Sequence, residues 1–120
     1  MQEGFGKLIF NDKYLYIGEF KNNKMNGKGK LYKENNLLYE GDFSNDMYEG
    51  EGKLFIEEDY IYAGKFLKGK PKGEGILYGK NKEIIYKGIF DENTLSQISP
   101  NIMLNYIKNS CINALKKLFK

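Results

Sequence analysis

The sequence predicts a mainly β protein: a single-layered antiparallel sheet of consecutive β-hairpins, followed by a C-terminal amphipathic α-helix. Two short patterns that recur about every 23 residues predict the sheet, and apolar residues at helical spacing near the C-terminus predict the helix. The composition agrees, because 10 Tyr and 8 Phe suit a pleated, half-buried surface. With 14 Gly and only 2 Pro, we expect the glycines to hold fixed positions in this sheet.

The first pattern is Tyr-x-Gly-x-Phe, and it predicts one strand of each hairpin. It occupies residues 16–20, 39–43, 62–66 and 86–90, at steps of 23, 23 and 24 residues. Successive side chains of a strand point to opposite faces, so Tyr, Gly and Phe share one face. The intervening residues are mostly polar, which makes the opposite face the solvated one.

The second pattern is Gly-x-Gly followed two positions later by Leu, and it predicts the other strand. It occupies residues 4–8, 27–31, 50–54 and 73–77. A residue without Cβ allows an aromatic ring to lie flat on the backbone, so we expect Gly-x-Gly to face the rings of the first pattern. Each mid-strand glycine costs roughly 0.5–1 kcal/mol relative to alanine. We expect ring packing to offset that cost.

The links between these strands are short and carry turn residues. Asn23, Asp46 and Gly69 each follow a repeat phenylalanine by three positions, and these residue types tolerate a left-handed backbone, so we expect φ > 0 there. The other links are short and largely polar, at 33–37, 56–59 and 79–82. Short links imply antiparallel hairpins, and stacked hairpins give one sheet of about eight strands.

The two patterns together resemble the MORN (membrane occupation and recognition nexus) repeat over residues 4–90, as about three full repeats with a half repeat at each end. The resemblance implies a single-layered sheet with a shallow aromatic groove. It also implies roles in cytoskeletal scaffolding, in ciliary or junctional assemblies, and in association with membrane lipids. Some small members bind a motor-tail peptide along the groove. Asn23 and Asp46 replace the commoner turn glycine, and Phe stands where many members have Trp, which makes the groove less bulky.

The composition changes after residue 93, and we divide the chain into a sheet over 1–93 and a helical segment over 94–120. Ser99 and Pro100 are a typical helix start. The apolar side of the helix comprises Met103 or Leu104, Ile107, Cys111, Ala114, Leu115 and Leu118. Three interpretations remain open for this helix: packing on the sheet, docking with a partner or a second copy, and lying on an anionic membrane surface.

Several classes of function lack their usual residues. The chain has no His, the commonest general base and metal ligand, so we expect no catalytic residues, no metal and no cofactor. All its basic residues are Lys, and without the Arg fork we expect no nucleic-acid partner. The single Cys111 fits a reducing compartment. We therefore expect a cytoplasmic protein, with cytoskeletal or membrane association left open.

The aromatic face is the candidate site, and it has two interpretations. It is either the core of the fold or an uncovered strip that binds a partner, because a single layer has nothing to cover it. The predicted partner-binding residues are Tyr16, Phe20, Leu31, Tyr39, Phe43, Leu54, Tyr62, Phe66, Leu77, Tyr86 and Phe90.

The expected function is that of a non-enzymatic adaptor or scaffold. It would hold a partner peptide or helix along the aromatic face, in a cytoskeletal, motor or ciliary assembly. The alternative is a peripheral membrane module that binds anionic lipids through its lysines and C-terminal helix. Exposed sheet ends also permit a homodimer.

Overall fold

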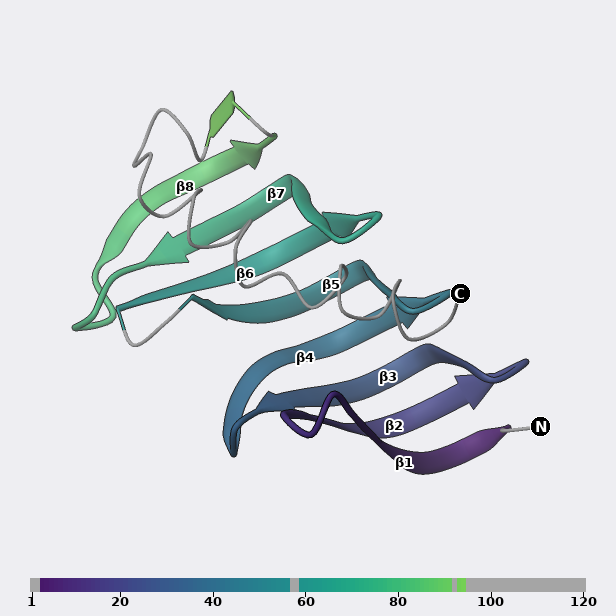
Figure 1. Ribbon diagram of the computed structural model, residues 1–120. Coiled ribbons are helices and arrows are strands. Elements are labelled where there is room, and N and C mark those ends of the chain that lie inside the picture. The colour runs from purple at the N-terminus through teal and green to yellow at the C-terminus, as the bar shows by residue number, and fades with distance from the viewer. Residues whose placement is uncertain (1–2, 57–58, 92, 95–120) are drawn as a thin grey trace.

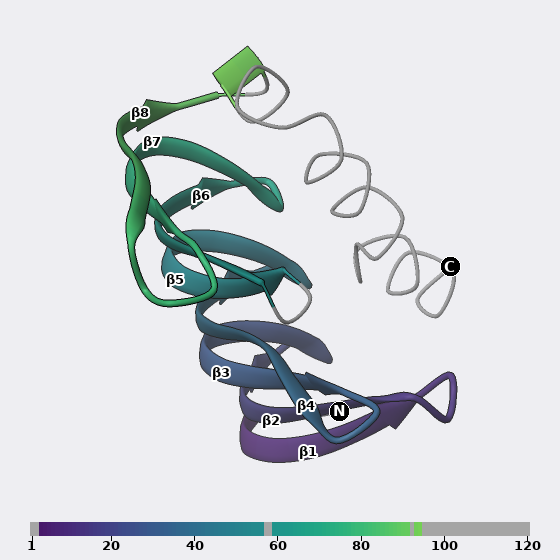
Figure 2. The same cartoon turned by 90° about the vertical axis from the view of Figure 1, so that its left-hand side faces the viewer.

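The computed structural model describes residues 3–56, 59–91, 93 and 94, and within them the chain forms one eight-stranded antiparallel sheet in sequence order (Figure 1). The expected sheet of stacked hairpins is therefore confirmed. The strands are β1 (Gly4–Phe10), β2 (Tyr14–Lys21), β3 (Lys24–Lys33), β4 (Asn36–Ser44), β5 (Met47–Ile56), β6 (Tyr60–Leu67), β7 (Lys70–Tyr78) and β8 (Ile84–Phe90). Each strand curves along its length, so the sheet is a trough rather than a flat layer (Figure 2).

A row of glycines crosses all eight strands. The strand register places one glycine of each strand opposite a glycine of the next. The row consists of Gly6, Gly18, Gly29, Gly41, Gly52, Gly64, Gly75 and Gly88. We call the side of the sheet that carries the repeat Tyr and Phe the aromatic face, and the opposite side the polar face. The glycine row lies at the middle of both.

The hairpin turns after the Tyr-x-Gly-x-Phe strands use left-handed backbone at both central residues. The positive φ values are 54° and 67° at Asn22 and Asn23, 50° and 70° at Asn45 and Asp46, and 50° and 86° at Lys68 and Gly69. Two consecutive positive φ values give the type I′ turn, whose twist matches that of the flanking strands. The predicted positive φ at the third position after each phenylalanine is confirmed.

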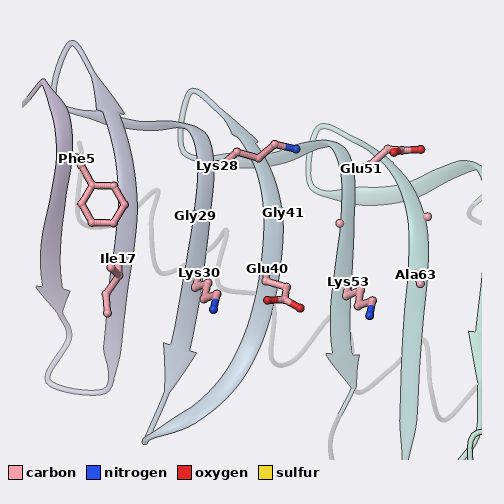
Figure 3. A pocket seen from close by; sticks show the side chains of 12 residues that line it. Phe5, Ile17, Lys28, Gly29, Lys30, Glu40, Gly41, Glu51, Lys53 and Ala63 are labelled. Carbon is pink, nitrogen blue, oxygen red and sulfur yellow. The ribbon is translucent and has the colours of Figure 1, made fainter.

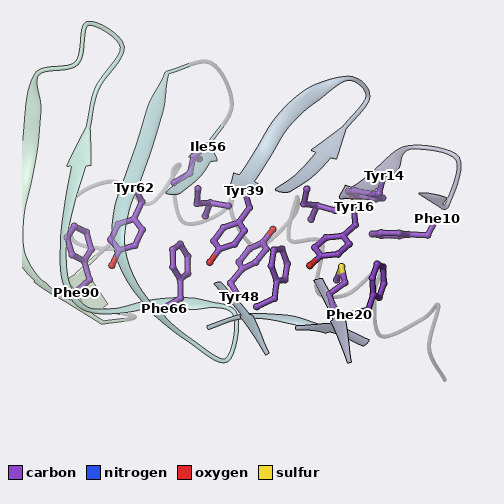
Figure 4. Close-up of a cluster of buried hydrophobic side chains, with 14 of the residues drawn as sticks. Phe10, Tyr14, Tyr16, Phe20, Tyr39, Tyr48, Ile56, Tyr62, Phe66 and Phe90 are labelled. Carbon is purple, nitrogen blue, oxygen red and sulfur yellow. The ribbon is translucent and has the colours of Figure 1, made fainter. Parts of the chain in front are cut away.

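The rings of the aromatic face pack in a continuous row that forms the core (Figure 4). Tyr39 shows the arrangement. Its ring lies on Gly52, where an added Cβ would collide with three of the tyrosine's atoms. The edges of Phe43 and Phe66 meet the Tyr39 ring with centroids 5.0 and 5.2 Å apart and planes near perpendicular. Edge-to-face contact is a favourable aromatic geometry. The expected ring-on-glycine packing is confirmed, and Phe66 carries it from one repeat into the next.

Among the described residues the last strand ends at Phe90, where a local turn begins. The Asp91 carboxylate accepts hydrogen bonds from the backbone N–H groups of Asn93 and Thr94, both at 2.9 Å. The predicted C-terminal helix lies outside the described residues. The helix, its three interpretations and the division at residue 93 stay predictions.

Candidate functional site

The structure brings all the predicted partner-binding residues together on the aromatic face, where they form the core. Every one of them is buried except Tyr86, which is half-buried. Tyr16, Tyr39 and Tyr62 are 0% exposed. This burial agrees with the first interpretation of the aromatic row. Direct contact between these side chains and a partner stays a prediction.

The buried tyrosine hydroxyls are satisfied by a recurrent irregularity in the sheet. The register shifts between Gly18 and Phe20 in the pairing of β2 with β3, and at the equivalent positions of β4 and β6. One residue of each of these three strands is therefore left out of the pairing with the next strand, namely Glu19, Asp42 or Lys65. The carbonyl oxygen of that residue accepts the hydroxyl proton of Tyr16, Tyr39 or Tyr62 at 2.7 Å. Each bulge therefore supplies an acceptor for a hydroxyl that burial would otherwise leave without a partner.

Burial also keeps these hydroxyls protonated. Desolvation raises the pKa of Tyr62 to about 12, although the hydrogen bond to the Lys65 carbonyl opposes the shift. Desolvation raises the pKa of Tyr16 as well, and the nearby Glu19 carboxylate adds to the effect. Because the neutral phenol is the favoured form, the tyrosines act as rigid hydrogen-bonded rings of the core.

The sequence analysis missed several residues of this core. Phe10, Tyr14 and Ile56 lie in it, and three more residues occupy equivalent positions in successive repeats. Met25, Tyr48 and Pro71 lie opposite Phe20, Phe43 and Phe66 in the strand register, and all three are buried. The Tyr48 ring stacks on Tyr39 with centroids 3.9 Å apart and an interplanar angle of 11°. Because their residue types differ, these three positions do not appear in the repeated sequence pattern. The signal that could have identified them is an apolar residue five positions after each phenylalanine.

The polar face carries a shallow groove that follows the glycine row (Figure 3). Its floor is the backbone of Gly29, Gly41, Gly52 and Gly64, which lie opposite one another on β3 to β6. Side chains that flank these glycines form the two walls. One wall consists of Ile17, Lys30, Glu40, Lys53 and Ala63, and the other of Phe5, Lys28 and Glu51. The sequence analysis identified this face as solvated but did not predict the groove.

Charges of both signs alternate along the groove. Lys30, Glu40 and Lys53 lie directly opposite one another on β3, β4 and β5. At the other wall, Lys28 Nζ forms an ion pair with Asp42 Oδ1 at 2.5 Å. The hydrogen bond to Asp42 raises the pKa of Lys28. Burial alone would raise the pKa of Asp42, but hydrogen bonds from Lys28 and from a backbone N–H outweigh burial and lower it.

Comparison with known families gives the same repeat units as the strand register. The MORN repeat profile matches residues 16–37, 39–55 and 62–83, just over half of the chain. The chain belongs to the MORN-repeat family. The three matched MORN repeats correspond to the strand pairs β2–β3, β4–β5 and β6–β7. A comparison with curated proteins gave no match.

MORN repeats generally take part in protein or membrane binding. In the part of the chain that the structure describes, no helix is long and apolar enough to cross a bilayer. The same residues contain no group of three or more His, Cys, Asp or Glu side chains that could hold a metal ion.

Proposed function

We propose that this MORN-repeat chain is a non-enzymatic adaptor or scaffold that holds an extended segment of a partner protein in the groove of its polar face. The observation that supports the proposal is the groove itself, an open channel floored by glycine backbone and walled by exposed charges. A surface of this kind can hold a peptide without any rearrangement of the core. The proposed setting is a cytoskeletal, motor or ciliary assembly in the cytoplasm.

The charges on one wall define the chemistry of the partner. Lys30 and Lys53 lie two strands apart with Glu40 between them, a separation of roughly 9.5 Å at the usual strand spacing. A peptide in the polyproline II conformation advances about 3.1 Å per residue with three residues per turn, so side chains three residues apart share one face and match that separation. The favoured partner segment therefore carries two acidic residues three positions apart.

The aromatic face is the second candidate surface. The sequence analysis placed the partner there, but a partner would reach these rings only if the core opened. Partner loss on mutating a buried phenylalanine would be hard to interpret, because such a change also destabilises the sheet. Surface variants of the groove separate the two candidates cleanly, since Lys30 and Lys53 are exposed.

We expect the double variant Lys30→Glu and Lys53→Glu to lose binding of the native partner by at least tenfold, because the acidic side chains of the partner would then meet like charges. The measurement is quantitative affinity capture from the native cell with the 120-residue chain as bait. The matched control is Lys68→Glu with Lys80→Glu, which makes the same change in net charge in exposed turns outside the groove. Unchanged capture by the groove variant, with both variants folded by circular dichroism, would rule out the groove.

The alternative function is binding of anionic lipids, which the net charge of +3 favours. The acidic residues in the groove oppose it, because they would be repelled by an anionic surface. Flotation with anionic vesicles at low salt tests this alternative. If the chain stays at the bottom of the gradient, the result supports the adaptor. If the chain floats with the vesicles and the groove variant does not, the result supports the lipid module.

A further inference from the structure

The two edges of the described sheet are complementary halves of one repeat. In the interior, each Tyr-x-Gly-x-Phe strand is followed by a Gly-x-Gly strand, at β2–β3, β4–β5 and β6–β7. Strand β8 carries the first half of this unit and, among the described residues, has no Gly-x-Gly strand after it. Strand β1 carries the second half, and no described strand precedes it.

Among the described residues, Tyr86 on β8 lacks the glycine of a following strand on which the other repeat tyrosines rest. The other three repeat tyrosines are fully buried, with a glycine of the following strand beneath each ring. Tyr86 is half-buried, and its hydroxyl lies 3.3 Å from the Ile89 carbonyl oxygen, against 2.7 Å in the other repeats. At the opposite edge, nothing lies within 4 Å of a Cβ placed on Gly4, whereas its interior equivalent Gly27 meets the side chain of Glu19 on the preceding strand. One edge of the described sheet therefore has a ring without its glycine floor, and the other lacks the side chains that a preceding strand supplies.

The polar face carries matching apolar groups at the same two edges. Phe5 and Ile9 on β1 are 74% and 72% exposed, and Ile89 on β8 is 61% exposed. Five of the six exposed large hydrophobic residues in the described region lie on these two strands. At the interior junctions, the positions equivalent to Ile89 and Phe5 are charged. These interior pairs are Glu19 with Lys28, Asp42 with Glu51, and Lys65 with Glu74.

We propose that β8 of one copy pairs with β1 of a second copy, antiparallel and in the register of the interior junctions. Gly88 then lies opposite Gly6 of the second copy, and the Tyr86 ring rests on that glycine. The same register sets Ile89 beside Phe5 and Ile85 opposite Ile9, which removes the exposed apolar groups of both edges from water. Because the two edges differ, the contact is head-to-tail. It leaves a free edge at each end of a dimer and can continue into a ring or a filament.

One pair opposes this contact and makes it sensitive to salt. The register places Lys87 of one copy opposite Lys7 of the next, and like charges directly opposite each other are destabilising. Salt screens this repulsion, so association strengthens as ionic strength rises. Lys87→Glu replaces the repulsion with attraction and strengthens association at low salt. The double variant Lys7→Glu with Lys87→Glu restores repulsion and returns association to the level of the unmodified chain.

Two single-edge variants test the head-to-tail geometry. Phe5→Lys blocks the β1 edge and Ile89→Lys blocks the β8 edge, and both side chains are exposed, so the sheet remains folded. We expect the unmodified chain to form dimers and larger species, each variant alone to be monomeric, and an equimolar mixture of the two to form a dimer of one copy each. Analytical ultracentrifugation or native mass spectrometry measures the masses. Leu67→Lys is the matched control, because Leu67 is 46% exposed but lies on an interior strand.

The pattern of masses decides the outcome. A monomeric unmodified chain at its highest soluble concentration overturns the proposal. A dimer of Ile89→Lys alone shows pairing of two β1 edges, a dimer of Phe5→Lys alone shows pairing of two β8 edges, and either result overturns it. Oligomers that both variants leave unchanged overturn it as well. Phe5 also lies on one wall of the groove, so partner capture is compared with Ile89→Lys, whose side chain is not part of the groove lining.

Discussion

At the scale of single residues, the glycine row holds the fold together because it allows the tyrosine rings to touch the backbone. The conformational cost of glycine in a strand is spread over eight strands. It is offset where a ring takes the space that a Cβ would fill. Gly29, Gly52 and Gly75 have ordinary strand backbone, so packing alone, and not a left-handed conformation, requires glycine there.

Gly52→Ala tests this requirement. We expect it to lower the free energy of unfolding by about 1–3 kcal/mol, the usual range for overpacking a tight core, because the added methyl group meets the Tyr39 ring and hydroxyl. Urea denaturation measures the change. The control is Lys53→Ala at the next position, whose side chain is exposed. Equal stability of the two variants would show that the ring does not depend on the glycine.

At the scale of elements, consecutive hairpins are joined through their turns as well as through their strands. The Asp46 carboxylate, in the β4–β5 turn, accepts a hydrogen bond from the Met25 N–H at 2.8 Å, and the Asp46 N–H donates to the Met25 carbonyl at 3.1 Å. One repeat later, the Gly69 N–H donates to the Tyr48 carbonyl at 2.9 Å. The turns therefore stack along one side of the sheet and fix the spacing of the repeats.

Asp46→Gly keeps the left-handed turn but removes the acceptor for Met25. We expect a loss of about 1–3 kcal/mol in unfolding free energy, the cost of leaving a buried N–H unpaired. Asp46→Asn keeps an oxygen acceptor and is the matched control. Denaturant unfolding at neutral pH compares the two variants. Equal stability of Asp46→Gly and wild type would mean that the turn contact contributes nothing.

The charge on Asp46 gives this comparison a pH dependence of known sign. Desolvation raises the pKa of Asp46 above its ordinary value of 3.8, against the opposing effect of the Met25 hydrogen bond. A raised pKa in the folded state favours folding at low pH, and that contribution disappears as pH rises through the folded-state pKa. Asp46→Asn should therefore gain stability relative to wild type as pH rises from below 3.8 to neutral.

At the scale of the whole molecule, the phenylalanine rings couple one repeat to the next. Phe43 meets Tyr16 of the preceding repeat, Tyr39 of its own and the Tyr48 ring. Phe20, at the start of the row, has one described ring contact, with Tyr16. In a repeat protein, stability is approximately the sum of the units and of the contacts between neighbours. The interior phenylalanines contribute more of the contacts between neighbouring repeats.

We expect Phe43→Ala to lower the free energy of unfolding by about 3–5 kcal/mol, the usual range for a buried phenylalanine. Phe20→Ala should lower it less, because fewer ring contacts are lost. Both residues are buried, so the comparison isolates coupling between repeats from burial. Chemical denaturation of both variants checks the order. An equal or larger loss in Phe20→Ala would show that ring contacts across repeats do not set the stability.

At the candidate site, the sequence predicted which residues share a face but not whether that face is open. The two sequence patterns identify the shared face, and the sequence analysis placed Tyr39 and Phe43 together correctly. Whether that face is open depends on what lies across it. Tyr48 stacks on Tyr39 because the pairing of β4 and β5 shifts by two residues between Gly41 and Phe43, and the sequence analysis did not predict that shift.

The sequence by itself determined the strands, the left-handed turns and the pairing of rings with glycines, because each of these follows from alternation along a strand and from the missing Cβ of glycine. Only the tertiary structure decided that the aromatic face is the buried core and that a charged groove runs along the polar face. Burial and grooves arise from neighbours on other strands, and the register that selects those neighbours depends on the whole sheet.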